Sequence, residues 1–294
     1  MIKIFYILTL VLIPTLISCG PQNDKKKIRL DSADTLQKRI NKEEKERSEQ
    51  RRALEKQAYA DSIRIDLVLQ NALKIANQQF NKDKFVKKYE VSPGGNPMSV
   101  EINLDNHFSN ASPHLIIRRN DHRNTIYIDI YAKAGSKFNK VVSHKQWSMT
   151  YVNDTIQDIN GDGLNDFVLN WHGLTGCCLK AFSIVYLLRQ GNKEFSENFE
   201  FINPTFSPKE KIIRGVCYGH PGETSMYKYK WNGEKLDTLE YVSYEINDKG
   251  KKTGKILISN TEPFGDKFKI LKRLIKVPSE YTKIEGYDWF TGRL

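Results

Sequence analysis

Short runs of alternating apolar and polar residues, separated by turn residues, fill most of the chain from Tyr89 to its end. Residues 125–131 (TIYIDIY) are the clearest example, because β-branched and aromatic residues recur there with a period of two. Residues 264–275 suit a last strand or a helix. Further strands are predicted at residues 167–169, 182–188, 212–218, 226–231, 239–246 and 255–258.

Turn residues stand between these runs. Residues 190–193, 231–234 and 247–250 contain Gly and Asn, and Asn-Gly between two strands is the strongest short hairpin signal. No helical patterns alternate with the strands, so the sheets should be antiparallel. We therefore expect a mainly β domain over residues 89–294, built as an antiparallel meander or sandwich or as an irregular propeller-like domain. No clean internal repeat is present, which disfavours a regular propeller.

Residues 158–166 (DINGDGLND) carry oxygen donors at a spacing that suits calcium. Side-chain oxygens stand at the first, third, fifth and ninth positions, glycine at the sixth permits a sharp turn, and the seventh offers its carbonyl. A hard cation needs about six oxygens from such a short segment. The twelfth position is Leu169, where an EF-hand places a bidentate Glu, and a strand is predicted to follow. The loop is therefore not an EF-hand.

The same nine residues resemble the D-x-N-x-D-G-x-x-D loop of the FG-GAP and VCBS (integrin-like) repeats, in which the ion holds a loop that leads into a β-strand. The resemblance implies a structural, non-catalytic calcium ion. Its implied ligands are Asp158, Asn160, Asp162, Leu164 through its carbonyl, and Asp166. The alternative is an Asx-rich turn with no metal, since Asp, Asn and Gly also form ordinary turns.

The first 18 residues have the layout of a secretory signal. A short basic start is followed by residues 4–17, which are almost wholly apolar but shorter than the ~20 residues of a membrane span. Residues 16–19 (LISC) resemble the bacterial lipobox, which implies lipid attachment to Cys19 after removal of residues 1–18. A buried structural cysteine is the alternative, but polar residues follow at once. We expect a lipoprotein of the bacterial cell envelope, held at the outer membrane and facing the periplasm or the surface.

Composition agrees with a soluble body on a lipid anchor. The mean hydropathy of -0.56 excludes a polytopic membrane protein. Lys and Arg number 46 against 35 Asp and Glu, a net charge of +11 that favours polyanionic neighbours. In the expected compartment these are lipid or cell-wall phosphates, so no nucleic-acid partner is predicted.

A charged segment separates the anchor from the β-domain. Residues 19–60 are predicted to form a helical or disordered tether, because charged residues dominate and opposite charges recur at i,i+4. A solvated spacer is favoured over a coiled coil. A coiled coil needs an apolar residue at the same position of successive heptads, but the residue seven positions after Ile40 is the charged Arg47. Residues 61–88 are predicted to form a packed helix, with Leu69 and Ala76 on its apolar face.

Three cysteines remain after Cys19, namely Cys177, Cys178 and Cys217. In an oxidising compartment we expect one disulfide between Cys217 and either Cys177 or Cys178; a vicinal bridge is rarer. A zinc site or a cysteine nucleophile with His172 or His220 is disfavoured, because adjacent cysteines lack the usual Cys-x₂₋₄-Cys spacing.

The calcium loop, the hairpin at 227–236 and the aromatic ending at 281–290 also resemble β-rich envelope lipoproteins, some of whose relatives are periplasmic immunity proteins against peptidoglycan hydrolases. The resemblance implies a binding module for envelope protein or glycan, with inhibition of a cell-wall hydrolase as one form of it. The alternative is a hydrolase acting on envelope glycan or peptide, with a cleft built from His172, His220, Glu223 or the cysteines. No catalytic sequence motif favours the enzyme.

Overall fold

Antiparallel strands make up most of the folded chain, which confirms the mainly β prediction. The computed structural model describes residues 33–293 except 123, 175, 177 and 264–267. The chain forms two units, Met1–Ala58 and Tyr59–Leu294. Residues 1–18 and Cys19, on which the signal and lipid predictions fall, lie outside the described residues.

Helix α1 (Ala33–Asn77) begins within the predicted tether. Between residues 35 and 58 its side chains are exposed, and ion pairs join Lys42 to Glu46 at 3.8 Å and Glu43 to Arg47 at 3.5 Å. Such i,i+4 pairs stabilise a solvated helix by only a few tenths of a kcal/mol each. Among the described residues, no helix combines the length and the apolar character needed to cross a membrane.

The later part of α1 is packed. The side chains of Val68, Leu69, Ala72 and Ala76 are buried at helical spacing. The helix ends at Asn77, so the prediction of a packed helix over residues 61–88 is wrong beyond that point, where strand β1 (Phe85–Val91) begins within the predicted range. The apolar helical pattern stops at Ala76, whereas alternate β1 residues pack against the same core, as a strand requires.

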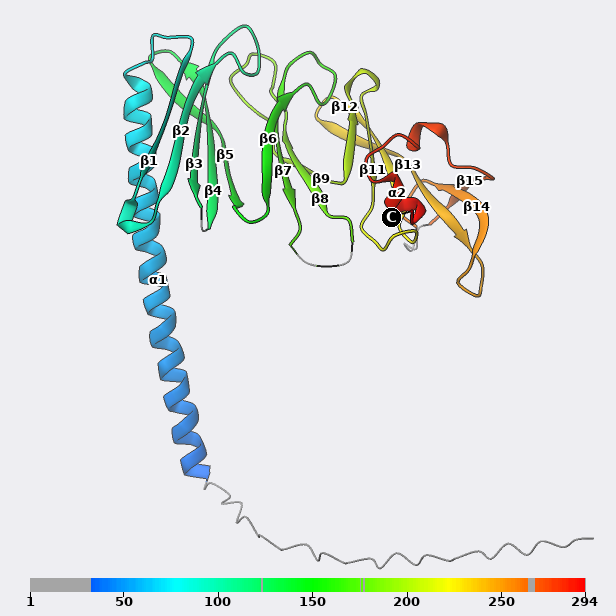
Figure 1. The fold of residues 1–294 in the computed structure, drawn as a ribbon, viewed down its shortest axis with the longest axis horizontal. Coiled ribbons are helices and arrows are strands. Elements are labelled where there is room, and N and C mark those ends of the chain that lie inside the picture. Colours follow the sequence, from blue (N-terminus) through cyan, green and yellow to red (C-terminus); the bar gives the residue numbers. More distant parts are fainter. Residues whose placement is uncertain (1–32, 123, 175, 177, 264–267, 294) are drawn as a thin grey trace, which may run out of the picture. The chain divides into compact units, whose positions relative to one another are not determined.

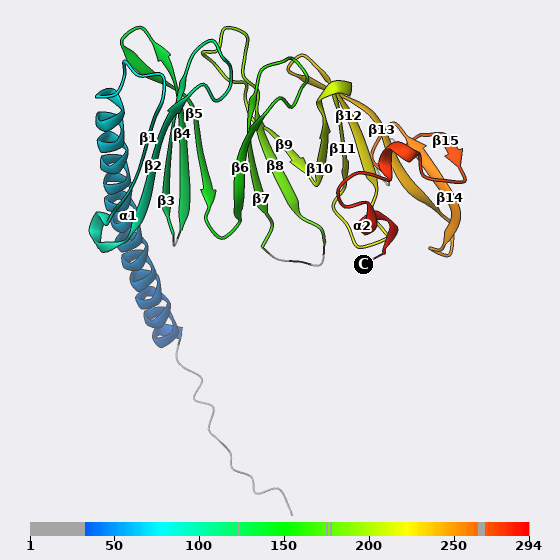
Figure 2. The same ribbon diagram turned by 45° about the horizontal axis from the view of Figure 1, so that its top comes forward.

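The strands form three antiparallel meanders in which neighbours in the chain are neighbours in the sheet (Figures 1 and 2). The first sheet holds β1, β2 (Met98–Asp105), β3 (His114–Asp121), β4 (Thr125–Ala134) and β5 (Lys137–Trp147). The second holds β6 (Tyr151–Gln157), β7 (Asp166–His172), β8 (Ala181–Tyr186) and β9 (Phe199–Ile202). The third holds β10 (Pro204–Ser207), β11 (Ile212–Val216), β12 (Met226–Asn232), β13 (Lys235–Ile246), β14 (Lys252–Ser259) and β15 (Ile270–Leu274).

Short helices complete the fold. Three are single 3₁₀ turns and one is a short α-helix near the end of the chain. They are η1 (Pro93–Gly95), η2 (Pro208–Glu210), η3 (Ser279–Tyr281) and α2 (Tyr287–Thr291). The predicted turns at Gly191, Gly233 and Gly250 all have positive φ, at 97°, 62° and 72°.

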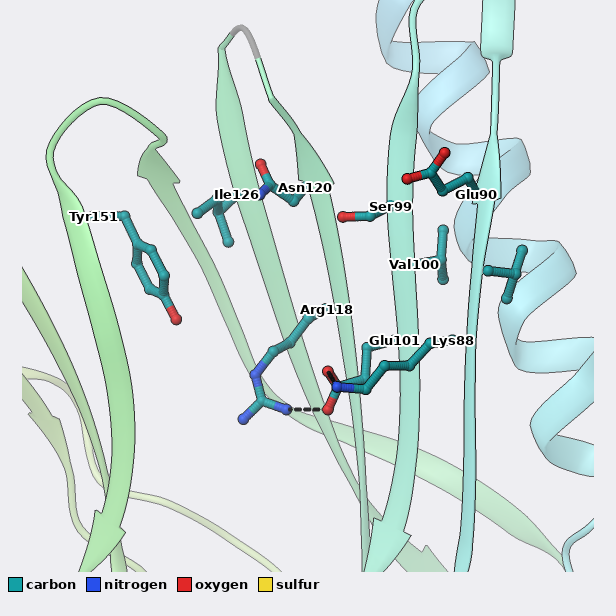
Figure 3. A pocket seen from close by; sticks show the side chains of 10 residues that line it. Lys88, Glu90, Ser99, Val100, Glu101, Arg118, Asn120, Ile126 and Tyr151 are labelled. Atoms are coloured by element: carbon teal, nitrogen blue, oxygen red, sulfur yellow. Dashed lines mark hydrogen bonds and ion pairs between the residues drawn. The ribbon is translucent and has the colours of Figure 1, made fainter.

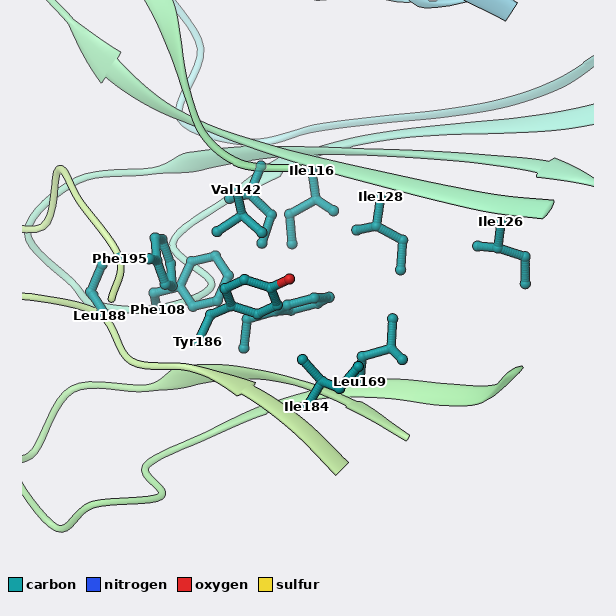
Figure 4. Close-up of a cluster of buried hydrophobic side chains, with 12 residues drawn as sticks. Phe108, Ile116, Ile126, Ile128, Val142, Leu169, Ile184, Tyr186, Leu188 and Phe195 are labelled. Atoms are coloured by element: carbon teal, nitrogen blue, oxygen red, sulfur yellow. The ribbon is translucent and has the colours of Figure 1, made fainter. Parts of the chain in front are cut away.

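Four apolar clusters hold these elements in layers. One joins α1 to the outer face of the first sheet, through residues such as Leu69 and Ile102. The next joins the first sheet to the second, where Ile128 faces Leu169 and Tyr186 (Figure 4). The other two join the second sheet to the third and the third sheet to the C-terminal segment. The first and second sheets are therefore covered on both faces, as in a sandwich with more than two layers.

Candidate functional site

The predicted calcium loop lies between β6 and β7 and turns tightly around its own carboxylates. The Asp158 carboxylate accepts hydrogen bonds from the backbone N–H of Gly161 at 2.7 Å and of Gly163 at 3.0 Å. Gly161 has φ 73° and Gly163 has φ 88°. Both values lie in the left-handed region that favours glycine, which explains the two glycines of the motif.

In the middle of the loop, side-chain oxygens again accept hydrogen bonds from nearby backbone N–H groups. Asn160 Oδ1 accepts a hydrogen bond from the Asp162 N–H at 3.1 Å, and Asp162 Oδ1 accepts one from the Leu164 N–H at 2.9 Å. Asn160 Nδ2 also donates to Asp162 Oδ2 at 3.2 Å. The side chain of Asn160 is therefore oriented by its neighbours in the loop.

Asp166 is the buried member of the set, with an exposed fraction of 0%. Its two carboxylate oxygens accept hydrogen bonds from the N–H groups of Ile159 and Leu188, both at 2.9 Å. The pKa of the Asp166 carboxyl is raised to about 7, mainly by burial; the two N–H donors act to lower it, and the negative charges of Asp162 and Asp158 act to raise it. Three acidic groups thus influence one another in this loop.

The donor chemistry of the loop fits a hard cation. Carboxylate, amide and carbonyl oxygens are the ligands that calcium takes, and an oxygen that accepts one hydrogen bond keeps a second lone pair. Among residues 33–293, apart from those not described, no group of three or more His, Cys, Asp or Glu side chains is gathered closely enough to hold a metal by itself. Any ion here would thus draw on the Asn160 side chain and the Leu164 carbonyl as well.

The two described cysteines, Cys178 and Cys217, are not joined by a disulfide. Cys217 follows β11, is buried and carries a free thiol. Burial raises its pKa to about 11, which disfavours the thiolate that a nucleophile or zinc ligand requires. Cys178 is half-buried and is not bridged to Cys217, and Cys177 lies outside the described residues, so only the pairing of Cys217 with Cys177 stays a prediction.

Of the histidines and the acid singled out in the sequence, His172 ends strand β7, whereas His220 and Glu223 lie in the loop between β11 and β12. His172 is exposed at the end of β7, with Nδ1 3.4 Å from the Lys180 carbonyl oxygen. His220 and Glu223 share one turn, in which the Glu223 N–H donates to the His220 carbonyl at 3.0 Å. Glu223 lines a cavity of about 410 Å³.

A second cavity, of about 510 Å³, opens between the first sheet and β6 (Figure 3). Arg118 of β3 donates through Nε to Asp154 Oδ2 at 2.9 Å and through Nη1 to Glu101 Oε1 at 3.3 Å. Lys88 lies 3.0 Å from Glu101, and the Tyr151 hydroxyl donates to Asp154 at 2.8 Å. These charges satisfy one another, so the network is suited to joining two sheets. The sequence offered no signal for it, because its members come from four strands.

No family model matches the chain, and comparison with curated proteins and with solved structures also gives no match.

Proposed function

We propose that this protein is a lipid-anchored component of the bacterial cell envelope whose β-domain is stabilised by calcium and acts as a binding module. The observation that carries the proposal is the loop at residues 158–166. It places three acidic side chains in one short turn, and one of them, Asp166, is buried. Like charges in one turn repel one another, and a bound cation would relieve that repulsion.

A calcium ion here would act on the packing of two sheets. The loop leads into β7 of the second sheet, and a Cβ atom at Gly161 would collide with the carbonyl oxygen of Pro208, in η2 beside the third sheet. An ion that fixes the loop would therefore also fix this contact. Its role is structural, because the loop holds its side chains in hydrogen bonds with its own backbone.

The anchor belongs to the same proposal. Cys19 would carry the lipid, and several acyl chains on one residue would hold the protein stably, since a single chain binds only marginally. The exposed, charged part of α1 supports a spacer role for the predicted tether, because it buries none of the side chains described from residue 35 to residue 58.

We favour binding over catalysis as the activity of the β-domain, with an envelope protein or glycan as the partner and inhibition of a wall hydrolase as one possible outcome. The raised pKa of Cys217 argues against thiol chemistry at that residue. The second candidate, a hydrolase of envelope glycan or peptide, has one observation in its favour: Glu223 and Glu262 line the same cavity.

Titration calorimetry of the full chain with Cys19→Ser tests the metal part directly. We expect one calcium ion per chain, with a Kd of about 10⁻⁴ to 10⁻³ M or tighter, and no comparable binding by Asp158→Asn. If the unaltered loop takes up no calcium at millimolar concentration, it is an ordinary Asx-rich turn.

A further inference from the structure

The cavity lined by Glu223 and Glu262, beside β13 and β14, differs from the cavity at Arg118 because its carboxylates form no ion pair with described residues. Glu223 and Glu262 are both exposed, and neither carboxylate receives a hydrogen bond or an ion pair from the described part of the chain. In the other cavity, by contrast, Arg118 and Lys88 are paired with acidic side chains. Unpaired acceptors in a concave site are available to a ligand.

Buried hydroxyl groups form the inner wall of the cavity at Glu223. Thr224, Ser225 and Ser243 have exposed fractions of 6%, 8% and 6%. The Thr224 hydroxyl donates to the Cys217 carbonyl at 2.7 Å, whereas the Ser243 hydroxyl makes no hydrogen bond with any described residue. The Ser243 hydroxyl oxygen is not itself sealed from solvent, so it can form a hydrogen bond with a ligand in the cavity.

An exposed aromatic ring lies at the rim. Tyr218 has an exposed fraction of 58%, and Lys180 Nζ lies 5.1 Å from its ring centroid. The other tyrosine of the cavity, Tyr244, stacks on Phe290 at 4.7 Å and has Lys252 Nζ 3.8 Å from its centroid. Tyr244 therefore belongs to the wall, and Tyr218 is the ring that a ligand can cover.

The walls are held in place by the C-terminal segment. The Trp289 indole N–H donates to the Gly219 carbonyl at 2.9 Å, and the Gly222 N–H donates to the Trp289 carbonyl at 2.8 Å. Gly222 has φ 74°, and a Cβ there would lie 3.2 Å from Lys252 Nζ. The loop that carries Tyr218 and Glu223 is thus fixed at both ends against α2, so the site is formed before a ligand arrives.

The charged side chains at the cavity indicate which class of ligand it can bind. Two carboxylates and the Lys252 ammonium line the cavity, and the Lys180 ammonium lies over Tyr218 at its rim, so the cavity offers no positive excess to an anion although the chain as a whole carries +11. Phosphate-bearing and other anionic ligands are disfavoured there. An uncharged saccharide suits the remaining features, because its hydroxyls donate to carboxylates and accept from Ser243 and Lys252, while its apolar ring face covers Tyr218.

From these features we infer that the cavity bounded by Tyr218, Glu223, Ser243, Lys252 and Glu262 binds a short uncharged oligosaccharide. A volume of about 410 Å³ lies within the range of about 300 to 1,000 Å³ found for ligand pockets. This inference rests on the proposed function as a binding module and identifies glycan as the ligand class.

Binding is tested by calorimetry and ligand-observed NMR on the full chain with Cys19→Ser. The probes are the tetrasaccharides of β-1,4-linked N-acetylglucosamine, β-1,4-linked glucose and α-1,4-linked glucose, with tetralysine as a cationic probe. We expect at least one tetrasaccharide to bind, with affinity reduced about tenfold or more by Tyr218→Ala and by Glu262→Gln, and several-fold by Ser243→Ala. Tyr59→Ala and Glu200→Gln change an exposed Tyr and an exposed Glu elsewhere and should bind as the unaltered chain does.

Failure of the inference has distinct signatures. Binding of tetralysine alone, binding of no probe, or saccharide binding that survives both Tyr218→Ala and Glu262→Gln would each overturn it. Calcium binding and membrane attachment are measured on the same variants. If those persist while no saccharide binds, the glycan assignment fails and the proposed anchored, calcium-stabilised module stands.

Discussion

The guanidinium group of Arg118, on the first sheet, meets the carboxylate of Asp154, on the second, with Nε 2.9 Å from Oδ2. The Asp154 side chain has an exposed fraction of only 6%, and that of Arg118 is 21%. Nη2 of Arg118 donates to the other Asp154 oxygen, which makes the pair bidentate. The interaction joins the same two sheets as the apolar cluster shown in Figure 4.

Removal of one partner should therefore cost far more than loss of a surface ion pair. We expect Arg118→Met to lower the free energy of unfolding by about 3 kcal/mol, because Asp154 is left as a buried charge. The matched control is Glu234→Gln, which breaks the exposed pair with Arg189 and should cost less than about 1 kcal/mol. Urea unfolding measures both. Equal losses in the two variants would show that the Arg118 pair adds nothing to sheet packing.

Calcium should raise the melting temperature of the protein through the loop at 158–166. Binding to the folded state alone adds about 2.7 kcal/mol at a hundredfold excess over Kd, or roughly 5 to 10 °C for a domain of this size. Asp162→Asn keeps an oxygen to accept the Leu164 N–H but removes a charge, so the increase should shrink or vanish. Asp248→Asn alters another turn aspartate and should keep the full response. A melting curve that is the same in calcium and in chelator contradicts the proposal.

The two glycines of the loop should differ in their tolerance of alanine. Both have positive φ, so both variants carry backbone strain of about 1 kcal/mol or more. A Cβ at Gly161 would in addition collide with the Pro208 carbonyl, whereas a Cβ at Gly163 meets open space. Gly161→Ala should therefore unfold at a lower denaturant concentration than Gly163→Ala. The order would be reversed or absent if the loop did not pack against η2.

Buried His114 should make the fold sensitive to mild acid. The centroid of its ring lies 5.1 Å from that of Phe108 and 6.1 Å from that of Phe195, and burial lowers its pKa from 6.5 to about 4. The unfolded chain therefore binds this proton more readily than the folded chain. The contribution of His114 to the free energy of unfolding is fully present above pH 6.5 and is lost as the pH falls to about 4, a total of about 3 kcal/mol.

Unfolding measured from pH 4 to 7 checks this slope by comparison of variants. In His114→Phe the free energy of unfolding should fall less between pH 7 and pH 4, because the contribution of His114 is absent. His122→Gln, at an exposed site, should keep the pH profile of the unaltered chain. The assignment fails if the pH profiles of all three proteins are parallel.

Cys19→Ser should move the protein from the membrane fraction to the soluble fraction of the envelope, since the substitution removes the site of lipid attachment. Fractionation with immunodetection gives the result, and metabolic labelling with a fatty acid shows the modification itself. A variant that still sediments with membranes would contradict the lipobox interpretation.

Local pattern was enough to predict several parts of this structure. The hairpin turns at Gly191, Gly233 and Gly250 depend on φ at single residues, and the turn at 158–166 closes through bonds between residues at most eight positions apart. Strands such as β4 carry their alternation within themselves. The predictions did not name seven of the strands, although β2 alternates just as clearly, with buried Met98, Val100, Ile102 and Leu104. The seven are β1, β2, β3, β5, β6, β9 and β10.

The amino-acid sequence by itself thus determined the mainly β character, the turns and the geometry of the acidic loop, because these depend on spacing along the chain. Tertiary structure alone decided that Arg118 meets Asp154, 36 residues away, and that Tyr218, Ser243 and Glu262 line one cavity. It also placed the end of α1 at Asn77, where the apolar face that packs on the first sheet runs out. Contacts between sheets depend on how long meanders stack, and that stacking is set by the summed burial of many side chains rather than by any local motif.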